Sequence, residues 1–185
     1  MLTQNLRIER LSPLNRTDFF KVLGEGEFGD CCFCVFWWQP SHEGWGDRTC
    51  EQNRQFREEL FTLNVNDGFL LYIKDVPQGW CQCGPRDQWK TLLNKYNLDP
   101  DPTVWAITCF VLNSEMMGKG VSHLFLSEVL TVLKSQEVKK VQAYPHLGKG
   151  LKSGDVWPGP LSIYEKAGFR TIKQDERRPV LELSL

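Results

Sequence analysis

The residues best suited to chemistry form a glycine-containing run between an apolar segment and an amphipathic one. Residues 104–112 are almost entirely apolar, and after a short connection comes the run Met117, Gly118, Lys119, Gly120, Val121 and Ser122. Glycines let a backbone approach an anion closely, and the first N–H groups of a helix, together with its dipole, favour negative charge. Lys119 adds a full positive charge. The order of strand, tight loop and helix therefore predicts a site for a phosphate group.

Seven cysteines raise a second chemical hypothesis, a thiol-based metal or redox site. Cys31 and Cys34 have C-x-x-C spacing, Cys81 and Cys83 have C-x-C spacing, and no histidine pair stands at zinc-finger spacing. If 31–38 is a strand, neighbouring thiols point to opposite faces and do not easily converge on one metal. We therefore expect most of the cysteines to be small buried hydrophobes, with no bound metal, and keep the metal or redox protein as an alternative.

Two other glycine-containing runs resemble phosphate loops only superficially. Residues 24–29 match G-x-G-x-x-G, but a helical segment precedes them, a strand-like segment follows, and three nearby acidic residues would repel a pyrophosphate. We interpret this run as a turn. Residues 148–154 lack the spacing of a phosphate loop, so they form either a loop that brings two lysines near an anionic ligand or a solvated loop.

The hydrophobic pattern predicts the elements that position these residues. Apolar and alternating runs predict strands at 6–11, 31–38, 69–74, 79–84, 104–112, 138–144 and 180–185. Helical spacing and terminal signals predict helices at 12–24, 48–63, 87–97, 118–134 and 161–167. Strands interleaved with helices indicate an α/β fold with a mixed sheet.

The composition indicates a folded, soluble protein. The chain has 185 residues, a 41% hydrophobic content and a formal net charge of -1, which fits one globular domain and argues against a nucleic-acid or membrane partner. The longest apolar run, 31–38, is far shorter than the roughly 20 residues that span a bilayer. An odd cysteine count and a start without a signal-peptide pattern predict a cytoplasmic protein with free thiols.

Two motifs resemble the GNAT superfamily of N-acetyltransferases. Residues 117–122 align with the family signature Q/R-x-x-G-x-G/A, and residues 164–169 read Y-E-K-A-G-F, which matches the family's Y-E-K-x-G-F in full. The spacing between the motifs is also similar, and the resemblance covers roughly 80–185. It is closer still to an uncharacterised bacterial subgroup with C-x-C-x-x-W, G-W-x-x-x-G-P-R and R-R-P runs, here near 32–38, at 79–86 and at 177–179.

The resemblance implies an α/β fold with a GNAT-like mixed, mostly antiparallel twisted sheet of about six or seven strands and helices on both faces. It implies a single domain over 1–185, with acceptor-side elements mainly in 1–100 and the acetyl-CoA-binding core in 104–170. Acetyl-CoA (coenzyme A) would be the co-substrate, without a metal. The acceptor would be a small-molecule or peptide amine, and relatives are often homodimers.

The resemblance also implies which residues bind the co-substrate. Its pantetheine arm would pair with the backbone of Phe110, Val111 and Leu112, and its pyrophosphate would lie on the run 117–122. Met117 replaces the family's usual Arg or Gln, which removes one side-chain contact but leaves the backbone N–H groups.

The implied reaction is direct attack of a primary amine on the thioester, with Tyr164 as the general acid. An aromatic packing residue is the alternative role of Tyr164. The candidates for a general base stay open: Glu115, His42 and His146, or ordered water. The acceptor side would use Trp37, Trp38 and Trp80, which belong with Trp45 to a group of four tryptophans, and at least two of the four are expected in the core. A non-catalytic coenzyme A or acyl-CoA binding or sensing module of the same fold is the alternative function.

Overall fold

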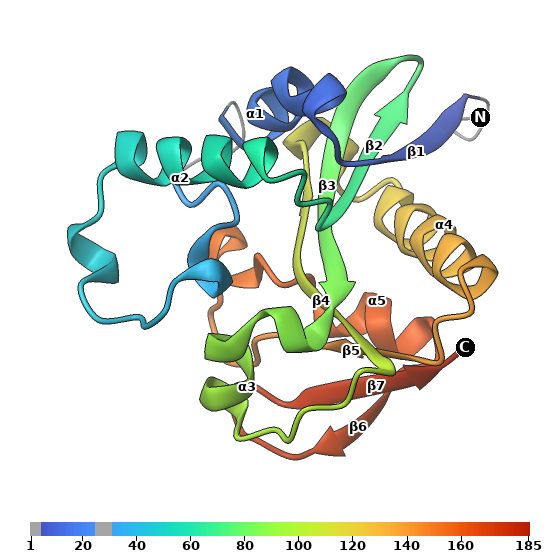
Figure 1. Cartoon of the computed structure of the whole chain (residues 1–185). Coiled ribbons are helices and arrows are strands. Elements are labelled where there is room, and N and C mark those ends of the chain that lie inside the picture. Colours follow the sequence, from blue (N-terminus) through green and yellow to red (C-terminus); the bar gives the residue numbers. More distant parts are fainter. Residues whose placement is uncertain (1–4, 25–30) are drawn as a thin grey trace.

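The computed structural model describes residues 5–24 and 31–185, and over these residues seven strands form one sheet (Figure 1). The strand order is β1-β2-β3-β4-β5-β7-β6. Neighbouring strands are antiparallel except β4 and β5, which are parallel. The prediction of an α/β fold with a mixed, mostly antiparallel sheet is confirmed.

The elements follow the predicted order closely. The strands are β1 (Leu6–Arg10), β2 (Gly68–Ile73), β3 (Val76–Pro85), β4 (Val104–Leu112), β5 (Lys140–Ala143), β6 (Arg170–Lys173) and β7 (Val180–Ser184). The α-helices in the described part of the chain are α1 (Arg16–Gly24), α2 (Cys50–Thr62), α3 (Lys90–Tyr96), α4 (Val121–Ser135) and α5 (Leu161–Lys166). The hydrophobic pattern did not predict β6, because this edge strand is exposed at all of its positions and shows no apolar alternation.

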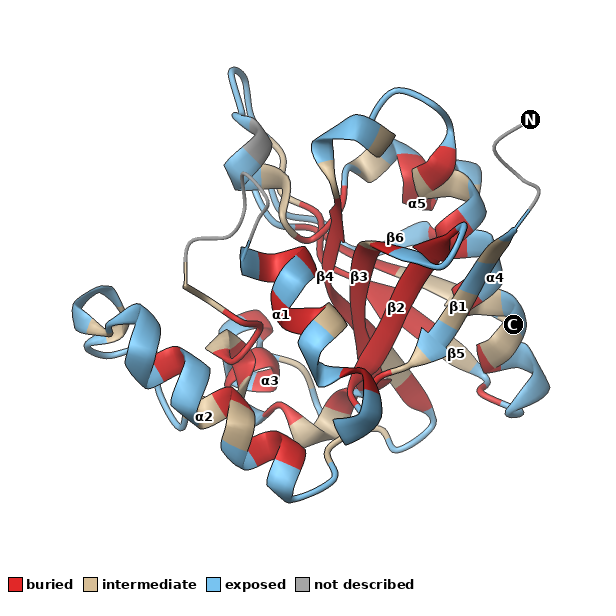
Figure 2. Cartoon of the chain, turned by 90° about the horizontal axis from the view of Figure 1, so that it is seen from above, coloured by how far each residue is buried: buried red, intermediate tan, exposed pale blue. Residues whose placement is uncertain are grey.

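Helices cover both faces of the sheet, as predicted. Alternate side chains of β2 point to opposite faces, so Phe69 and Leu71 pack with α4, whereas Leu70 and Tyr72 pack with α1. α5 joins α4 on the first face, and α2 and α3 join α1 on the second. Figure 2 shows β2, β3 and β4 as largely buried ribbons between these helices.

The prediction of a buried strand at 31–38 is wrong. Cys31, Phe33 and Cys34 have φ values of 65°, 40° and 51°, which lie in the left-handed region and not in the β region. The Val35 N–H donates to the Cys32 carbonyl in a turn, and a 3-10 helix (Phe36–Trp38) follows. The run is apolar throughout because it packs over the sheet and between helices, which bury side chains on several sides of an irregular segment.

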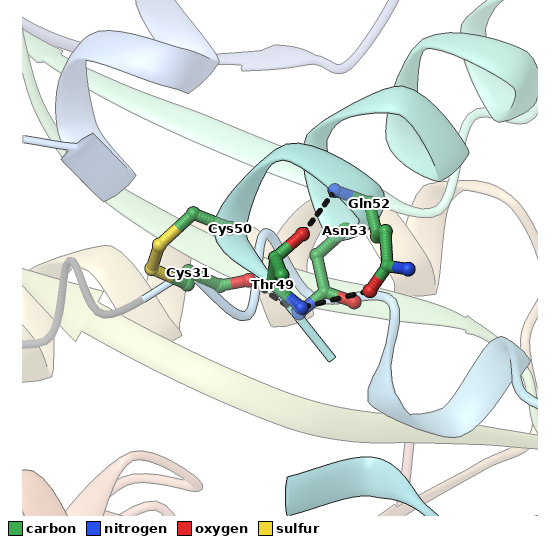
Figure 3. The surroundings of a disulfide bond; sticks show 5 residues. All are labelled: Cys31, Thr49, Cys50, Gln52 and Asn53. Atoms are coloured by element: carbon green, nitrogen blue, oxygen red, sulfur yellow. Dashed lines mark hydrogen bonds between the residues drawn. A yellow bond between two sulfur atoms is a disulfide. The ribbon is translucent and has the colours of Figure 1, made fainter. Parts of the chain in front are cut away.

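The prediction of free thiols is wrong for two cysteines. Cys31 and Cys50 form a disulfide that ties this irregular segment to the first turn of α2 (Figure 3). Thr49 caps the same turn: its hydroxyl accepts from the Gln52 N–H at 3.2 Å, and the Gln52 side chain accepts from the Thr49 N–H at 2.8 Å. The Asn53 side chain donates to the Cys31 carbonyl at 2.7 Å, so the segment and the helix are joined twice.

Two sequence-based interpretations remain, one for the run 24–29 and one for a membrane-spanning segment. Of the run 24–29, interpreted as a turn, only Gly24 lies within the described residues, where it ends α1. Among the helices of the described residues, none is both long enough and apolar enough to cross a membrane.

Candidate functional site

The most distinctive backbone feature is the divergence of the two parallel strands. β5 pairs with β4 only from Val104 to Ile107, although β4 continues to Leu112. The divergence begins at an irregularity: opposite β3, Thr108 is an extra residue between two paired positions. The second half of β4 therefore keeps β3 on one side and has an edge without a strand on the other.

Backbone groups of two predicted residues point to this open edge. Successive residues of a strand turn their N–H and C=O groups alternately toward and away from a neighbouring strand. The Asn113 N–H donates to the Gln78 carbonyl on the β3 side, so Val111 also faces β3, whereas Phe110 and Leu112 face the open edge. Of the three predicted backbone contacts for pantetheine, two are thus directed to the opening.

The glycine-containing run follows β4 and leads into α4, as predicted. Gly118 and Gly120 have φ values of 71° and 76°, a conformation that strains other residues, and added Cβ atoms would meet nothing. Glycine is therefore required here by the backbone conformation and not by crowding. Within the described residues, the N–H groups of 118–122 donate no well-aligned hydrogen bond although 117–120 form a turn, and Lys119 is exposed beside them. This cluster of free donors suits a phosphate group.

The open edge of β4 is occupied by the chain itself. The Phe110 N–H donates to the Trp157 carbonyl at 2.8 Å, and the Tyr164 hydroxyl donates to the next carbonyl, that of Pro158. Gly159 has a φ of 90°, and a Cβ at that position would lie 2.7 Å from the Tyr164 hydroxyl oxygen. The two predicted donor groups, one from β4 and one from α5, are thus held by two consecutive carbonyls.

Tyr164 is fully buried among core side chains of the sheet and α4. Burial, and to a smaller extent the thiols of Cys81 and Cys109, raise the pKa of its hydroxyl well above the ordinary value. The hydroxyl therefore stays protonated at physiological pH and is a weaker acid than an ordinary phenol. Its role as a general acid remains a prediction.

A cavity of about 370 Å³ lies on the other face of β4. It is lined by five aromatic residues, three cysteines, one histidine, one arginine and four others: Phe33, Phe36, Trp37, Trp45, Trp157, Cys32, Cys34, Cys109, His146, Arg178, Leu23, Gln82, Val111 and Gly154. Its volume is at the lower end of the range for small-molecule sites. Trp157 connects the cavity with the open edge of β4, because its carbonyl accepts from the Phe110 N–H and the residue also lines the cavity.

The irregular segment 31–38 forms one wall of the cavity and is firmly anchored. The Gln82 side chain donates to the Cys34 carbonyl at 2.8 Å, and the Thr91 hydroxyl donates to the Trp37 carbonyl at 2.7 Å. Together with the disulfide, these contacts from β3 and α3 fix a segment that has no regular hydrogen-bond ladder of its own.

Only one of the three candidate bases lines the cavity. The His146 Nδ1 lies 2.8 Å from the Asp155 carbonyl, which can only accept, so Nδ1 carries the proton and a neutral ring has a lone pair on Nε2. Burial and the positive charge of Arg178 lower the pKa of His146 below 6.5, and the contact with Asp155 opposes them only in part. His42 instead stacks on Phe36, and Glu115 is exposed; neither is a lining residue.

The three predicted tryptophans lie in different environments. Trp37 lines the cavity, whereas Trp80 is fully buried and donates from Nε1 to the Cys34 sulfur at 3.1 Å. Trp38 donates from Nε1 to Asp67 at 2.8 Å and is not a lining residue. The cavity thus brings Trp37, and Trp45 of the same group, together with His146, and core roles account for the geometry of Trp38 and Trp80.

The remaining thiols are poor metal ligands in this environment. Burial raises the pKa of Cys32 and of Cys83 to about 12 and raises the pKa of Cys34 well above its ordinary value, so these thiols are protonated at neutral pH. Among residues 5–24 and 31–185, no group of three or more His, Cys, Asp or Glu side chains could hold a metal ion.

Sequence reasoning missed most of the cavity. The sequence analysis considered the run 148–154 as a loop that could lie near an anionic ligand, but it singled out neither Trp157, which follows that run, nor Arg178. Arg178 belongs to the R-R-P run already noted, so a motif marked its position but not its role. Phe33 and Cys34 could not be assigned to a cavity wall while 31–38 was taken for a strand.

Sequence comparisons find no match, whereas structure comparisons find proteins that share the fold. No model of a known protein family matches the chain, and no curated protein sequence matches it. A PaiA N-acetyltransferase from Thermoplasma acidophilum, solved with coenzyme A, is 14% identical with a TM-score of 0.57 over 98% of this chain and 99% of that one. A putative GNAT-family acetyltransferase from Desulfovibrio desulfuricans is 12% identical with a TM-score of 0.58 over 97% and 98%.

The aminoglycoside acetyltransferase AAC(6')-Ib, solved with ribostamycin and coenzyme A, is similar to the same degree. It is 17% identical with a TM-score of 0.62, over 97% of this chain and 93% of that one. Likeness at this level of identity concerns the fold. The chain therefore has the fold of these acetyltransferases along nearly its whole length.

Proposed function

We propose that this protein is an acetyl-CoA-dependent N-acetyltransferase that acts on a primary amine. The observation that carries the proposal is the divergence of β4 from β5 after Ile107, which leaves Phe110 and Leu112 facing an open edge that leads to the free N–H groups of 118–122. Proteins of the same fold have been solved with coenzyme A bound, which supports the assignment.

The residues present fit the co-substrate, which would supply an activated acetyl thioester. The N–H groups of 118–122 and the Lys119 ammonium would hold the pyrophosphate, with Met117 contributing only its backbone. The outward-facing carbonyl of Phe110 and the outward-facing backbone groups of Leu112 would pair with the amides of the pantetheine arm. Val111, which faces β3, would contribute its side chain to the acceptor cavity instead.

Two side chains and one backbone group would carry the transfer. The amine nitrogen would form a bond to the thioester carbon while His146 Nε2 takes a proton from it, and the Phe110 N–H would stabilise the oxyanion. When the C–S bond breaks, the Tyr164 hydroxyl would give its proton to the thiolate. At the end of the cycle, His146 would release its proton to solvent and Tyr164 would take one back from solvent.

This reaction requires the segment around Trp157 to move. The Trp157 carbonyl holds the Phe110 N–H and the Pro158 carbonyl holds the Tyr164 hydroxyl, so neither donor is free for a thioester in the present arrangement. Each hydrogen bond has a net worth of about 0.5–1.5 kcal/mol, which binding of the co-substrate can offset. Displacement of Trp157 would also connect the β4 edge with the cavity.

The same two contacts favour the second candidate function. A protein whose donors stay engaged by Trp157 and Pro158 would bind coenzyme A or an acyl-CoA through the 117–122 run without catalysis. Met117, in place of a charged or amide side chain, is consistent with weaker binding.

Binding of acetyl-CoA and release of coenzyme A thiol separate these functions. Acetyl-CoA at 100 times its Kd should raise the unfolding free energy by about 2.7 kcal/mol, and thiol should appear when an amine panel is added. No stabilisation at millimolar acetyl-CoA would reject both functions, and stabilisation without thiol release would favour the binding module. Lys119→Gln should weaken binding by up to about fivefold, whereas Lys139→Gln, an exposed lysine beyond the end of α4, should leave it unchanged.

A further inference from the structure

The charge of the cavity wall restricts its ligand. None of the described lining residues is an Asp or a Glu, and the one permanently charged side chain among them is Arg178. A polycationic amine would have to give up hydration against this wall without gaining an opposite charge. Among the lining residues, an acceptor with several ammonium groups would therefore find no carboxylate to pair with.

Arg178 is available to a ligand. Its side chain is exposed in the segment that precedes β7, and it forms no ion pair with any other residue in the described part of the chain. It lines the same cavity as the candidate base His146. A guanidinium in this position is suited to bidentate pairing with a carboxylate.

The rest of the wall suits a flat ring. Phe36 lies 4.9 Å from Trp45 and 6.1 Å from Trp157 between ring centroids, and Trp37 lies 6.3 Å from Trp157, so the aromatic lining is continuous. Trp37 is also 97% buried, and its Nε1–H has no acceptor within the described structure. Aromatic faces stack on ligand rings, and a buried donor without a partner gains from an acceptor brought by a ligand.

Building on the proposed transferase, we infer that its acceptor is a primary amine on an aromatic body that also carries a carboxylate. The carboxylate would pair with Arg178, the ring would lie against the aromatic lining, and the amine would face His146. The pairing would also neutralise a charge that disfavours protonation of His146, so the bound anion would make this residue a stronger base.

A binding experiment tests this class without requiring catalysis. The probes are N-acetyl-L-phenylalanine, which has the ring and the carboxylate, and N-acetylphenethylamine, which has the same ring and amide but no carboxylate. Isothermal titration should show the first binding about tenfold more tightly. Arg178→Gln should abolish that difference, and Arg177→Gln, the matched change at the adjacent exposed arginine, should preserve it.

Equal affinity for the two probes, no binding of either, or an equal loss in the Arg177→Gln variant would overturn the inference. A turnover assay then separates it from the proposed function, with L-phenylalanine, phenethylamine and kanamycin as acceptors and acetyl-CoA as donor. The preference for the carboxylate probe without thiol release would support the ligand class and reject the transferase. Kanamycin as the best acceptor would reject the ligand class and leave the transferase standing.

Discussion

Loss of the hydrogen bond between Tyr164 and Pro158 should lower stability and turnover but raise the affinity for the co-substrate. Tyr164→Phe removes a hydroxyl in the core and leaves the buried Pro158 carbonyl without its donor. A buried acceptor left unpaired costs about 1–3 kcal/mol, so the unfolding free energy should fall by that amount. For a chain of this length, the melting temperature should drop by about 2–4 °C for each kcal/mol, measured by thermal and urea unfolding.

The same substitution should lower turnover but not co-substrate affinity. If Tyr164 is the general acid, kcat should fall by about 10²- to 10⁴-fold. Affinity for acetyl-CoA should improve by about two- to tenfold, because the Tyr164–Pro158 hydrogen bond no longer has to be broken when the segment moves. Steady-state kinetics and titration calorimetry measure the two quantities separately.

Tyr144→Phe is the matched control. Tyr144 is another fully buried tyrosine, and its hydroxyl donates to the Gln142 side chain at 2.8 Å and not to a carbonyl of the Trp157 segment. It should lose about 1 kcal/mol of stability and keep its kcat and its affinity. The reasoning fails if Tyr164→Phe loses acetyl-CoA affinity as severely as it loses turnover, because Tyr164 would then be a packing residue.

Three further predictions follow from other contacts. Turnover should fall as the pH drops through the pKa of His146, which burial lowers below 6.5, because protonation fills the Nε2 lone pair. His146→Gln should remove this pH dependence and lower kcat about a hundredfold or more. The control variant His42→Gln should keep the pH profile of the wild type. Cys50→Ser opens a disulfide that joins residues 19 apart and should lower the unfolding free energy by about 3 kcal/mol, and a reductant should then lower the wild-type midpoint but not that of the variant. Burial raises the pKa of Asp67, but the Arg57 guanidinium and hydrogen bonds from Gln82 and Trp38 outweigh burial and hold this pKa below its usual value. The ionised Asp67 should therefore stabilise the fold above about pH 4, and this stabilisation should be lost as the pH falls through the lowered pKa. Asp67→Asn leaves the buried Arg57 charge unpaired and should cost about 3–5 kcal/mol in urea unfolding at neutral pH, and a loss under 1 kcal/mol would contradict the pairing.

Local pattern was sufficient where one helix or strand buries one face. α4 buries Val121, Phe125, Val129 and Leu133, the apolar residues whose helical spacing predicted it, and β4 has the predicted bounds. The glycines of the 117–122 run were informative for a local reason too, since Gly118 and Gly120 adopt positive φ values that other residues rarely adopt.

Local pattern failed where the surroundings determined the conformation. An apolar run such as 31–38 is compatible with a buried strand or with any irregular segment covered on several sides, and only Gln82, Thr91 and Cys50, all distant in sequence, fix the second form. The sequence by itself determined the α/β class with a mixed sheet, the order of most elements except β6 and the segment 31–38, and the glycine run that leads into α4. Tertiary structure decided that the Trp157 and Pro158 carbonyls hold the donors of Phe110 and Tyr164, and that His146 and Arg178 meet at one cavity, because contacts between residues far apart in the chain depend on packing and leave no periodic signal in the sequence.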